Sequence, residues 1–325
     1  MTDSSLSVGV IGVGSMGQHH ARVYSELANA DLIGVSDVDP DRAEQIATEY
    51  GTDALSMDEL IGAVDAVSIA VPTEYHYEVA RKCIENGVSI LVEKPFVSDV
   101  EEGEELIELA EQHGVQIQVG HIERFNPAVE ALEEIVPHLE VTAVDARRLG
   151  PDPDREIDDS VVSDLMIHDV DIVLSLIDSD IDSIQTAGTA EGRYATSTLT
   201  FVDDTISSLT ASRQTQQKVR ELTITADDRY VKVDYLDQSI EIHRQSAPEF
   251  ITDDGSMKYR HESIVEHPVV ENIEPLKNEL QSFLEAVAED NTPPVSGTDG
   301  LEAVKIIQEI DEQAFSTEGP NETVQ

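Results

Sequence analysis

The chain has 325 residues, of which 40% are hydrophobic, enough to build one large or two ordinary domain cores. It carries 67 acidic and 20 basic residues, which gives a formal net charge of −47. Such a surface repels nucleic acid and acidic lipid, so neither is expected as a partner. The acids are spread along the chain and form no tail. This indicates an anionic surface that salt must screen, as in the cytoplasm of a halophile.

A single cysteine, Cys83, leaves no disulfide framework and favours a reducing compartment. The N-terminus has no basic stretch ahead of an apolar run, and no apolar run reaches transmembrane length. We therefore expect a cytoplasmic protein with no membrane partner. Cys83 falls inside a predicted helix and is interpreted as a packing residue.

The first predicted elements form a strand, a tight turn and a helix. A short apolar strand at 7–11 meets three glycines spaced G-x-G-x-x-G, and a helical pattern follows to about Leu27. In such a turn the first glycine permits the bend, the second lets a pyrophosphate approach the backbone, and the third lets the helix pack on the strand. The helix N-terminus offers N–H groups to the phosphates. The expected contacts to a dinucleotide are Gly12, Gly14, Ser15, Met16 and Gly17.

The second predicted strand, at 32–36, ends at Asp37, 25 residues after Gly12. A carboxylate at this point accepts hydrogen bonds from the adenosine ribose and repels a 2′-phosphate. No basic residue follows before Arg42, so the sequence favours NAD over NADP. The alternative is an incidental glycine turn in another α/β fold, with Asp37 as an ordinary acid at a strand end.

Strands and helices continue to alternate up to about Gly120, which predicts a parallel sheet with helical connections. The predicted elements of this half are a helix at 39–50, a short strand at 54–55, a brief helix opened by a capping box at 56–59, a strand at 66–71, a helix at 76–86, a strand at 88–92, a helix at 99–113 and a strand at 116–119.

The pattern changes after this point. The sequence predicts a helix at 126–136, a strand at 139–149, a helix at 164–177, successive strands from 183 to 244, an irregular segment at 248–268, and helices at 274–289 and 300–315. Strands 194–202 and 205–213 face each other across a two-residue turn, which indicates an open, mostly antiparallel sheet. The predicted fold class is therefore α/β, with a dinucleotide-binding Rossmann domain at 1–121, a second α/β domain at 122–317 and a disordered tail at 318–325.

Ligands of an open parallel sheet bind outside the carboxyl ends of its strands. Those ends deliver Pro72, Thr73 and His76, then Glu93 and Lys94, then His121, Arg124 and Asn126. Lys94 directly follows a buried strand, where partial desolvation beside a cationic nicotinamide would favour its neutral form. It would then bind a substrate hydroxyl or take its proton. The alternative is a charged strand end with proline as the terminator.

The predicted helix at 164–177 carries a second group of polar residues. Its apolar residues form one stripe, and Asp164, His168, Asp171 and Ser175 lie on the opposite face. Asp164 and His168 are four residues apart, so the carboxylate can orient the imidazole for general acid–base catalysis. The alternative is the solvated polar face of an acid-rich chain. The pair lacks further ligands at a suitable spacing, so no metal is expected.

Three motifs together resemble one family. The N-terminal G-x-G-x-x-G, the triplet Glu93-Lys94-Pro95 and the spacing Asp164-x-x-x-His168 are similar to those of the glucose–fructose oxidoreductase, inositol dehydrogenase and rhizopine-catabolism (Gfo/Idh/MocA) family. The resemblance extends to about Phe315. It implies a Rossmann domain followed by a substrate-binding α/β domain whose open sheet mediates subunit contacts. It also implies reversible hydride transfer between NAD(P) and a sugar, sugar nucleotide or cyclitol.

The resemblance also implies roles for individual residues. It makes Lys94, Asp164 and His168 catalytic. The cofactor-binding set implied outside the glycine turn is Asp37, Pro72, Thr73, His76, Glu93 and Lys94, and the substrate-binding set is Lys94, Arg124, Asn126, Asp164 and His168. The segment 71–74 departs from the family's T-P-N-x-x-H element.

Segments 120–127 and 164–171 are similar to the UDP-N-acetylglucosamine 3-dehydrogenase group of this family, which implies oxidation of that sugar nucleotide at its 3-hydroxyl. Val161-Val162 stand where most members of the family have a glycine pair. A diphosphate substrate requires local cations in this anionic chain. The candidates are Arg124, Arg147, Arg148 and Arg155. The alternative is that Arg147 and Arg148 are surface arginines paired with neighbouring acids.

Two further functions stay open at this point. One is an inositol or free-sugar dehydrogenase, and the other, from a different class, is a non-catalytic regulator that senses a dinucleotide or a sugar. The sequence also leaves open whether Lys94 or His168 is the base, which direction the reaction takes, and whether the second-domain sheet builds a homodimer or a homotetramer.

Overall fold

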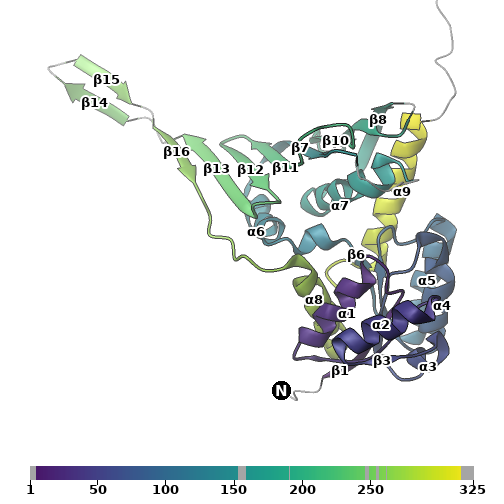
Figure 1. Cartoon of the computed structure of the whole chain (residues 1–325). Helices are drawn as coiled ribbons and strands as arrows, with labels where there is room; N and C mark the ends of the chain where they lie inside the picture. Colours follow the sequence, from purple (N-terminus) through teal and green to yellow (C-terminus); the bar gives the residue numbers. More distant parts are fainter. Residues whose placement is uncertain are drawn as a thin grey trace, which may run out of the picture. The chain divides into compact units, whose positions relative to one another are not determined.

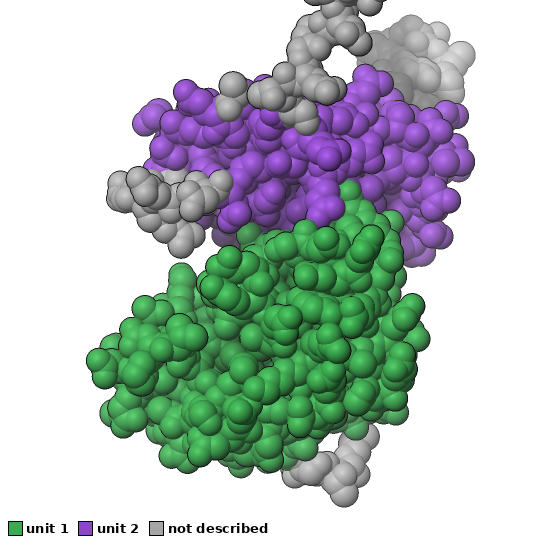
Figure 2. Space-filling view, turned by 90° about the vertical axis from the view of Figure 1, so that its right-hand side faces the viewer, with its two compact units in different colours: residues 1–125, 273–305 green, residues 126–272, 306–325 purple. Residues whose placement is uncertain are grey.

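The computed structural model describes residues 5–152, 159–189, 191–245, 249–253, 256–260 and 262–315. The chain forms two compact units, which Figure 2 shows in different colours. The first comprises residues 1–125 and 273–305, and the second comprises residues 126–272 and 306–325. This division differs from the one expected at residue 121, because the segment Ile273–Lys305 packs with the N-terminal residues. The tail expected at 318–325 lies outside the described residues.

The first unit is built on a six-stranded parallel sheet in the order β3-β2-β1-β4-β5-β6 (Figure 1). Its strands are β1 (Leu6–Ile11), β2 (Ala30–Ser36), β3 (Asp53–Ala54), β4 (Ala66–Ile69), β5 (Ser89–Glu93) and β6 (Ile117–Gly120). The parallel Rossmann sheet predicted from the alternation of elements is thus confirmed. The chain order reverses beside β1, so the carboxyl ends of β1 and β4 mark the place where such sheets bind ligands.

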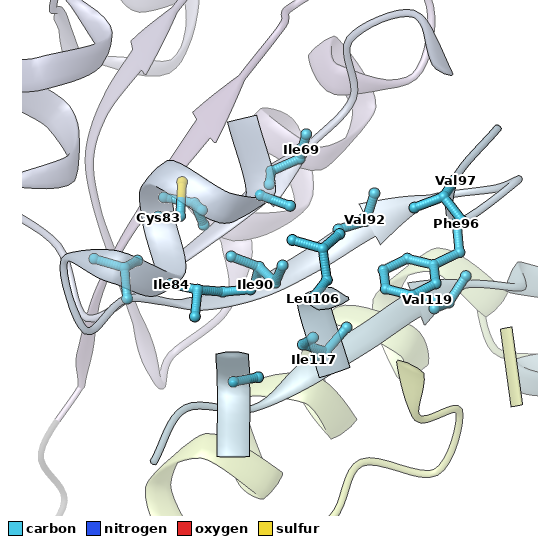
Figure 3. Close-up of a cluster of buried hydrophobic side chains, with 14 of the residues drawn as sticks. Ile69, Cys83, Ile84, Ile90, Val92, Phe96, Val97, Leu106, Ile117 and Val119 are labelled. Carbon is cyan, nitrogen blue, oxygen red and sulfur yellow. The ribbon is translucent and has the colours of Figure 1, made fainter. Parts of the chain in front are cut away.

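Helices cover both faces of this sheet. One buried cluster joins the sheet to α1 (Gly17–Glu26), α2 (Pro40–Tyr50) and α8 (Pro275–Glu289). The other joins it to α3 (Met57–Ile61), α4 (His76–Glu85), α5 (Val100–His113) and the first part of α9 (Gly297–Phe315). Figure 3 shows the second cluster, in which Leu106 and Ile90 lie among the strand side chains. Cys83 is fully buried there, which confirms its role in packing.

Local signals set the helix ends in this unit. Asp39 accepts hydrogen bonds from the first N–H groups of α2, and Gly51 ends that helix in the left-handed conformation at φ 69°. Ser56 and Glu59 form the predicted capping box at the start of α3. These caps explain why the first half of the fold follows the local sequence pattern so closely.

The second unit contains an eight-stranded sheet in the order β16-β13-β12-β11-β7-β10-β9-β8. Its strands are β7 (Val141–Leu149), β8 (Ile181–Gly188), β9 (Tyr194–Phe201), β10 (Ile206–Ser212), β11 (Val219–Ala226), β12 (Arg229–Asp234), β13 (Ser239–Gln245) and β16 (Ser263–Glu266). The pair β10–β7 is parallel, and the other described pairs of this sheet are antiparallel. The predicted hairpin is confirmed as β9–β10. Helices α6 (Pro127–Ile135) and α7 (Ile167–Leu176) pack against the sheet.

One expectation for this unit is wrong. The segment 248–268 contains strands where an irregular stretch was expected: β14 (Glu249–Asp253) pairs with β15 (Ser256–Arg260), and β16 pairs with β13. Pairing with distant residues decides the structure of these strands. The helix predicted at 164–177 is present, with the π-helical turn η4 (Val162–Met166) as its first part and α7 as the rest. No helix in the described part of the chain is long and apolar enough to cross a membrane.

Candidate active site

The glycine-rich turn after β1 has the predicted conformation. Gly12 has φ +86°, which side chains rarely allow, and a Cβ on Gly17 would lie 1.8 Å from the Gly12 carbonyl oxygen. A Cβ on Gly14 would approach no non-neighbouring atom of the described residues closer than 4.0 Å. Ser15 and Met16 complete the turn before α1, whose first turn carries no acidic residue. The turn is therefore open at Gly14, beside a positive helix end, and fits a pyrophosphate.

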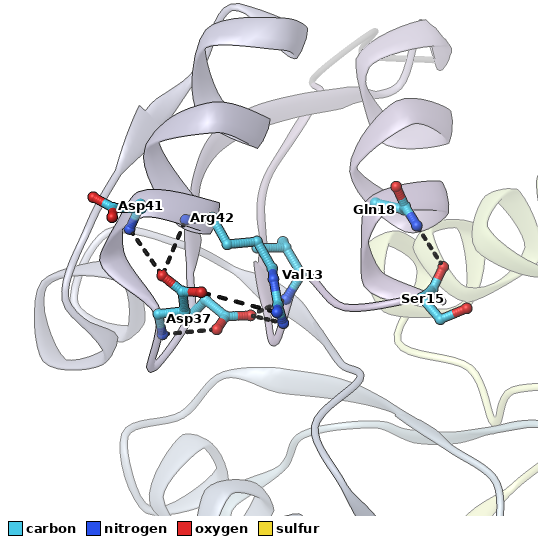
Figure 4. Close-up of polar contacts among 7 residues, drawn as sticks. Val13, Ser15, Gln18, Asp37, Asp41 and Arg42 are labelled. Carbon is cyan, nitrogen blue, oxygen red and sulfur yellow. Dashed lines mark hydrogen bonds and ion pairs between the residues drawn. The ribbon is translucent and has the colours of Figure 1, made fainter. Parts of the chain in front are cut away.

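Asp37, directly after β2, contacts this turn (Figure 4). Its Oδ2 accepts the N–H of Val13 at 2.8 Å, and its Oδ1 accepts the N–H of Asp39 at 2.9 Å. Each carboxylate oxygen has a second lone pair that can accept a ribose hydroxyl. Arg42, five residues further along the chain, lies with Nη1 4.0 Å from the Asp37 Oδ2. The fold thus places the guanidinium of Arg42 beside Asp37, the acid that favours NAD over NADP.

Pro72 and Thr73 follow β4 at the same edge of the sheet. His76, the first residue of α4, is buried, with Nε2 3.0 Å from the carbonyl oxygen of Val71 and Nδ1 2.9 Å from that of Pro95. Burial lowers the pKa of this imidazole. The ring therefore links the backbone after β4 to the backbone after β5, and both of its nitrogens face main-chain oxygens.

Glu93 ends β5, and half-buried Lys94 follows it, with a cis peptide bond to Pro95. Oε1 of Glu93 lies 2.9 Å from Nε2 of His20 on α1, whose side chain is fully buried. Burial opposes the charged form of Glu93, but the hydrogen bond with His20 and the charge of Lys94 outweigh it and lower the pKa of the carboxyl. Sequence reasoning missed His20, although it stands three residues after the last glycine of the motif.

The residues after β6 divide into two kinds. His121 is fully buried, and burial together with the charges of Lys94 and Arg124 lowers its pKa to about 3. Arg124 is half-buried in the 3-10 turn η2 (Ile122–Phe125). Asn126 caps α6: its Oδ1 accepts the N–H of Ala128, and its Nδ2 donates to the carbonyl oxygen of Tyr235, each at 3.1 Å. The amide of Asn126 is therefore used within the fold.

Asp164 lies in η4, in the second unit, and its carboxylate is held by a residue that the sequence did not single out. Nη2 of Arg213 donates to Oδ2 of Asp164 at 2.6 Å, and Nη1 donates to the carbonyl oxygen of Asp159 at 2.6 Å. Arg213 directly follows β10 and is almost fully buried. Local spacing gives no signal for this contact, because the two residues are 49 positions apart.

His168 is half-buried in the first turn of α7. The next residue, Asp169, is buried and makes a bidentate pair with Arg148 of β7, with Nε–Oδ2 3.0 Å and Nη2–Oδ1 2.9 Å. Asp171 is also buried. On the polar face considered for this helix, Asp171 is therefore in the interior, Asp164 and His168 are partly exposed, and Ser175 is exposed.

The arginines proposed for a diphosphate are placed differently from that expectation. Arg148 is the buried partner of Asp169, and exposed Arg147 pairs with Glu221 at 3.0 Å. Both are paired with acids, as in the alternative, although Arg148 is not on the surface. Arg155 lies outside the described residues. Within the described residues, no group of three or more His, Cys, Asp or Glu side chains is arranged to hold a metal ion.

A Rossmann sheet, a glycine turn open to phosphate, an acid after β2 and a lysine after β5 together define an NAD-dependent dehydrogenase. Residues 6–121 match the family model described as "Oxidoreductase family, NAD-binding Rossmann fold". The chain is 34% identical over 291 residues to UDP-N-acetylglucosamine 3-dehydrogenase from Acidithiobacillus ferrooxidans, which covers 87% of this chain and 89% of that protein. The chain therefore belongs to the Gfo/Idh/MocA family of oxidoreductases.

Other comparisons agree with this assignment. The crystallised UDP-N-acetylglucosamine 3-dehydrogenase from Acidithiobacillus ferrooxidans superposes with a TM-score of 0.86 at 32% identity, over 95% of this chain and 97% of that one. Inositol 2-dehydrogenase from Rhizobium meliloti is 26% identical over 319 residues, 92% of this chain and 93% of that protein. The resemblance stated from sequence motifs, the two-domain α/β fold and the NAD cofactor are thus confirmed.

Proposed function

We propose that this dehydrogenase oxidises UDP-N-acetylglucosamine at the 3-hydroxyl and produces the 3-keto sugar nucleotide. The observation that carries the proposal is the 34% identity with a UDP-N-acetylglucosamine 3-dehydrogenase over most of both chains, against 26% with an inositol 2-dehydrogenase over a similar length. The exposed fraction of Asp164, about a quarter, and the half-burial of Lys94 and His168 support it, since groups that handle a substrate proton must be reachable.

The cofactor supplies the acceptor for the hydride that leaves the carbinol carbon. We expect it to be held by the residues of the glycine turn, by Asp37 at the ribose, and by the segments at Pro72-Thr73 and Glu93-Lys94. His76 supports the backbone next to both segments, at the carbonyl oxygens of Val71 and Pro95. Its contribution to cofactor binding is therefore indirect in this proposal.

The side chains must bind the substrate hydroxyl and remove its proton. Lys94 and His168 are the groups that can do so, since a neutral amine or imidazole accepts a proton near neutral pH. Asp164 orients His168 and stabilises its charged form. Proton transfer from the O–H group accompanies loss of the hydride from the same carbon, so the products are a ketone, the reduced cofactor and one proton.

A UDP-sugar also requires a cation for its diphosphate. Our candidate is Arg124, which is half-buried in η2 and directly follows the cofactor-binding strands in the chain. Asn126 stays in the proposed substrate-binding set, since its capping bonds to Ala128 and Tyr235 use one donor and one lone pair of an amide that has two of each. Arg124→Ala should therefore raise the KM for the UDP-sugar more than it lowers kcat.

The test is NAD reduction followed by absorbance in molar KCl, with UDP-N-acetylglucosamine, free N-acetylglucosamine and myo-inositol as substrates. UDP-N-acetylglucosamine should be oxidised with a far higher kcat/KM than the free sugar, because the remote nucleotide supplies binding energy. Efficient turnover of myo-inositol or a free hexose, without turnover of the UDP-sugar, would assign the second candidate function. Binding of NAD and a sugar without turnover would instead favour a sensing regulator.

We also propose a homodimer or homotetramer built through the second-unit sheet. On one face of this sheet, short polar side chains and two larger apolar ones are exposed or half-exposed: Tyr194, Thr196, Thr198, Thr200, Ile206, Ser208 and Thr210. Small side chains let a second sheet approach closely. Light scattering in molar KCl should give at least twice the chain's mass of 35.6 kDa. A monomer under these conditions would contradict the assembly.

Finally, we propose that the protein works in the cytoplasm of a salt-rich cell. The support is the net charge of −47, which is costly without screening.

A further inference from the structure

The guanidinium of Arg213 fixes the carboxylate of Asp164 and also binds the main chain just before the helical turn that contains Asp164. Arg213 donates through Nη2 to Asp164 and through Nη1 to the carbonyl oxygen of Asp159, both at 2.6 Å. One contact is to the main chain just before η4, and the other is to a side chain inside it. Arg213 therefore fixes the position of Asp164 relative to the backbone of residues 159–164.

Arg213 is itself held in place. Its N–H donates to the carbonyl oxygen of Arg193 at 3.0 Å, and the residue directly follows β10, which pairs with β7 and β9. Its side chain is 7% exposed, so the surrounding protein restricts its motion and solvent ions screen its charge only weakly. The guanidinium thus projects from a rigid strand end, which makes it suited to positioning another group.

The segment that Arg213 bridges is an unusual one. Residues 162–166 form a π-helical turn, and such turns occur mostly as single-turn bulges in helices and are frequent at functional sites. Ser160 supports the turn, since its Oγ accepts the N–H groups of Val162 and Ser163 at 3.2 Å each. A wider turn rotates the residues that follow it, so the direction of Asp164 relative to His168 depends on how this turn is held.

A second arginine provides a useful contrast. Arg148 holds Asp169 in a pair whose side chains are 3% and 2% exposed, and its guanidinium lies 5.5 Å from the ring centre of Tyr235. Asp169 is thus sealed in the interior and anchors α7 to the sheet. Asp164 differs, because a quarter of its side chain is exposed while one oxygen is held by Arg213. The first pair anchors the helix, and the second fixes an acid that ligands can reach.

We propose that Arg213 is a positioning residue for the acid–base pair of Asp164 and His168. It holds Asp164 charged and oriented toward His168, and it touches no reacting atom itself. This inference rests on the proposed function, because it assigns Asp164 and His168 to proton transfer. A purely structural ion pair would stabilise the fold without changing the protonation of His168 or the dependence of turnover on Asp164.

The experiment is a double-mutant cycle on the full chain in molar KCl. It compares Arg213→Gln, Arg213→Lys, Asp164→Asn and the Arg–Asp double variants, with UDP-N-acetylglucosamine and NAD as substrates. Arg213→Gln should lower kcat about 10- to 100-fold with NAD affinity unchanged, and Arg213→Lys should recover part of the loss. In the Asp164→Asn background, the Arg213 substitutions should have little further effect, because residues that act as a unit are not additive. Arg244→Met, which removes an ion pair with Glu266 elsewhere in the second unit, is the control and should leave kcat unchanged.

A second readout needs no turnover. NMR of 15N-histidine-labelled protein should show His168 titrating at lower pH in Arg213→Lys than in the wild type or Arg244→Met, because a displaced carboxylate no longer favours the imidazolium. Equal losses of kcat in both backgrounds, or an unchanged His168 titration, would overturn the inference. If Arg213→Gln does not fold, Arg213→Lys decides by the same two criteria. If wild-type protein reduces no NAD with any tested sugar, the proposed function is overturned separately. The titration of His168 would still test whether Arg213 positions Asp164.

Discussion

Nε2 of His20 and Oε1 of Glu93 lie 2.9 Å apart in the interior of the first unit, where they join the glycine-turn helix to the end of β5. Removal of the imidazole leaves the buried Glu93 carboxylate without this hydrogen bond, and an unsatisfied buried group costs about 1–3 kcal/mol, or more when it is charged. We therefore expect His20→Ala to lower the free energy of unfolding by about 3 kcal/mol in denaturant titrations. The neighbouring His19 is exposed, so His19→Ala should have almost no effect. Equal stability of the two variants would show that the contact contributes nothing.

Cofactor choice should depend on Asp37 and Arg42 together. Wild-type protein should bind NAD at least about tenfold more tightly than NADP, a difference of about 1.4 kcal/mol, because the carboxylate repels a 2′-phosphate. Asp37→Ser should reduce this preference, since Arg42 stays near the site without its acidic partner. The double variant Asp37→Ser/Arg42→Ala should lose the gain in NADP affinity. Calorimetry with both cofactors measures this, and equal wild-type affinities would contradict the assignment.

Stability should fall as the pH falls below about 6.5. His121 has a pKa lowered to about 3 in the fold, and the pKa of His76 is lowered too. An unfolded imidazole titrates near pH 6.5, so below that value the unfolded chain binds more protons than the folded one. The stabilisation is complete above about pH 6.5 and is lost progressively toward pH 3. Thermal midpoints measured from pH 8 to pH 4 should show the decline, with a shallower slope for His121→Asn than for the wild type.

Turnover should depend on both candidate bases. General acid–base groups contribute about 10²- to 10⁴-fold to rate, so Lys94→Ala and His168→Ala should each lower kcat within that range. Asp164→Asn should cost less, because it keeps the shape of the side chain and acts through His168. NAD affinity, measured separately, should change little in the His168 variant. Wild-type turnover in both alanine variants would place the chemistry on other residues.

Salt should stabilise the fold strongly. With a net charge of −47, repulsion within the chain is severe in dilute buffer, and a Debye length of about 3 Å at 1 M salt removes most of it. We expect the thermal midpoint to rise steeply between about 0.1 M and 1 M KCl. A midpoint that stays level or falls over this range would contradict adaptation to a salt-rich cytoplasm.

The parts of the site that sequence predicts are those set by local spacing. The glycines at 12, 14 and 17 adopt the expected turn, because the steric demands on them come from the turn and from the strand and helix directly beside it. The capping box at Ser56 and the hairpin of β9 and β10 form for the same reason, since their partners are close in the chain.

The parts that sequence misses depend on distant partners. Arg213 reaches Asp164 across 49 positions, and Arg148 reaches Asp169 across 21. Residue patterns within one helix give no information on these pairs, so buried acids on α7 were indistinguishable from solvated ones. The strands after residue 248 were missed because they are defined by hydrogen bonds to other strands, and their sequences show no apolar periodicity that would predict them.

The helix α8 contributes Leu276, Leu280 and Phe283 to the cluster that buries Val8 and Tyr24, yet about 150 residues are synthesised between the end of residues 1–125 and the start of this segment. At translation rates of about 5–20 residues per second, one face of the nascent Rossmann sheet stays partly uncovered for roughly 7–30 s. A ribosome-bound chain is thus open to aggregation for that time. For the same reason, a truncated gene that encodes residues 1–125 alone should give an insoluble product, and any minimal cofactor-binding module cut from this protein must carry residues 273–305 as well.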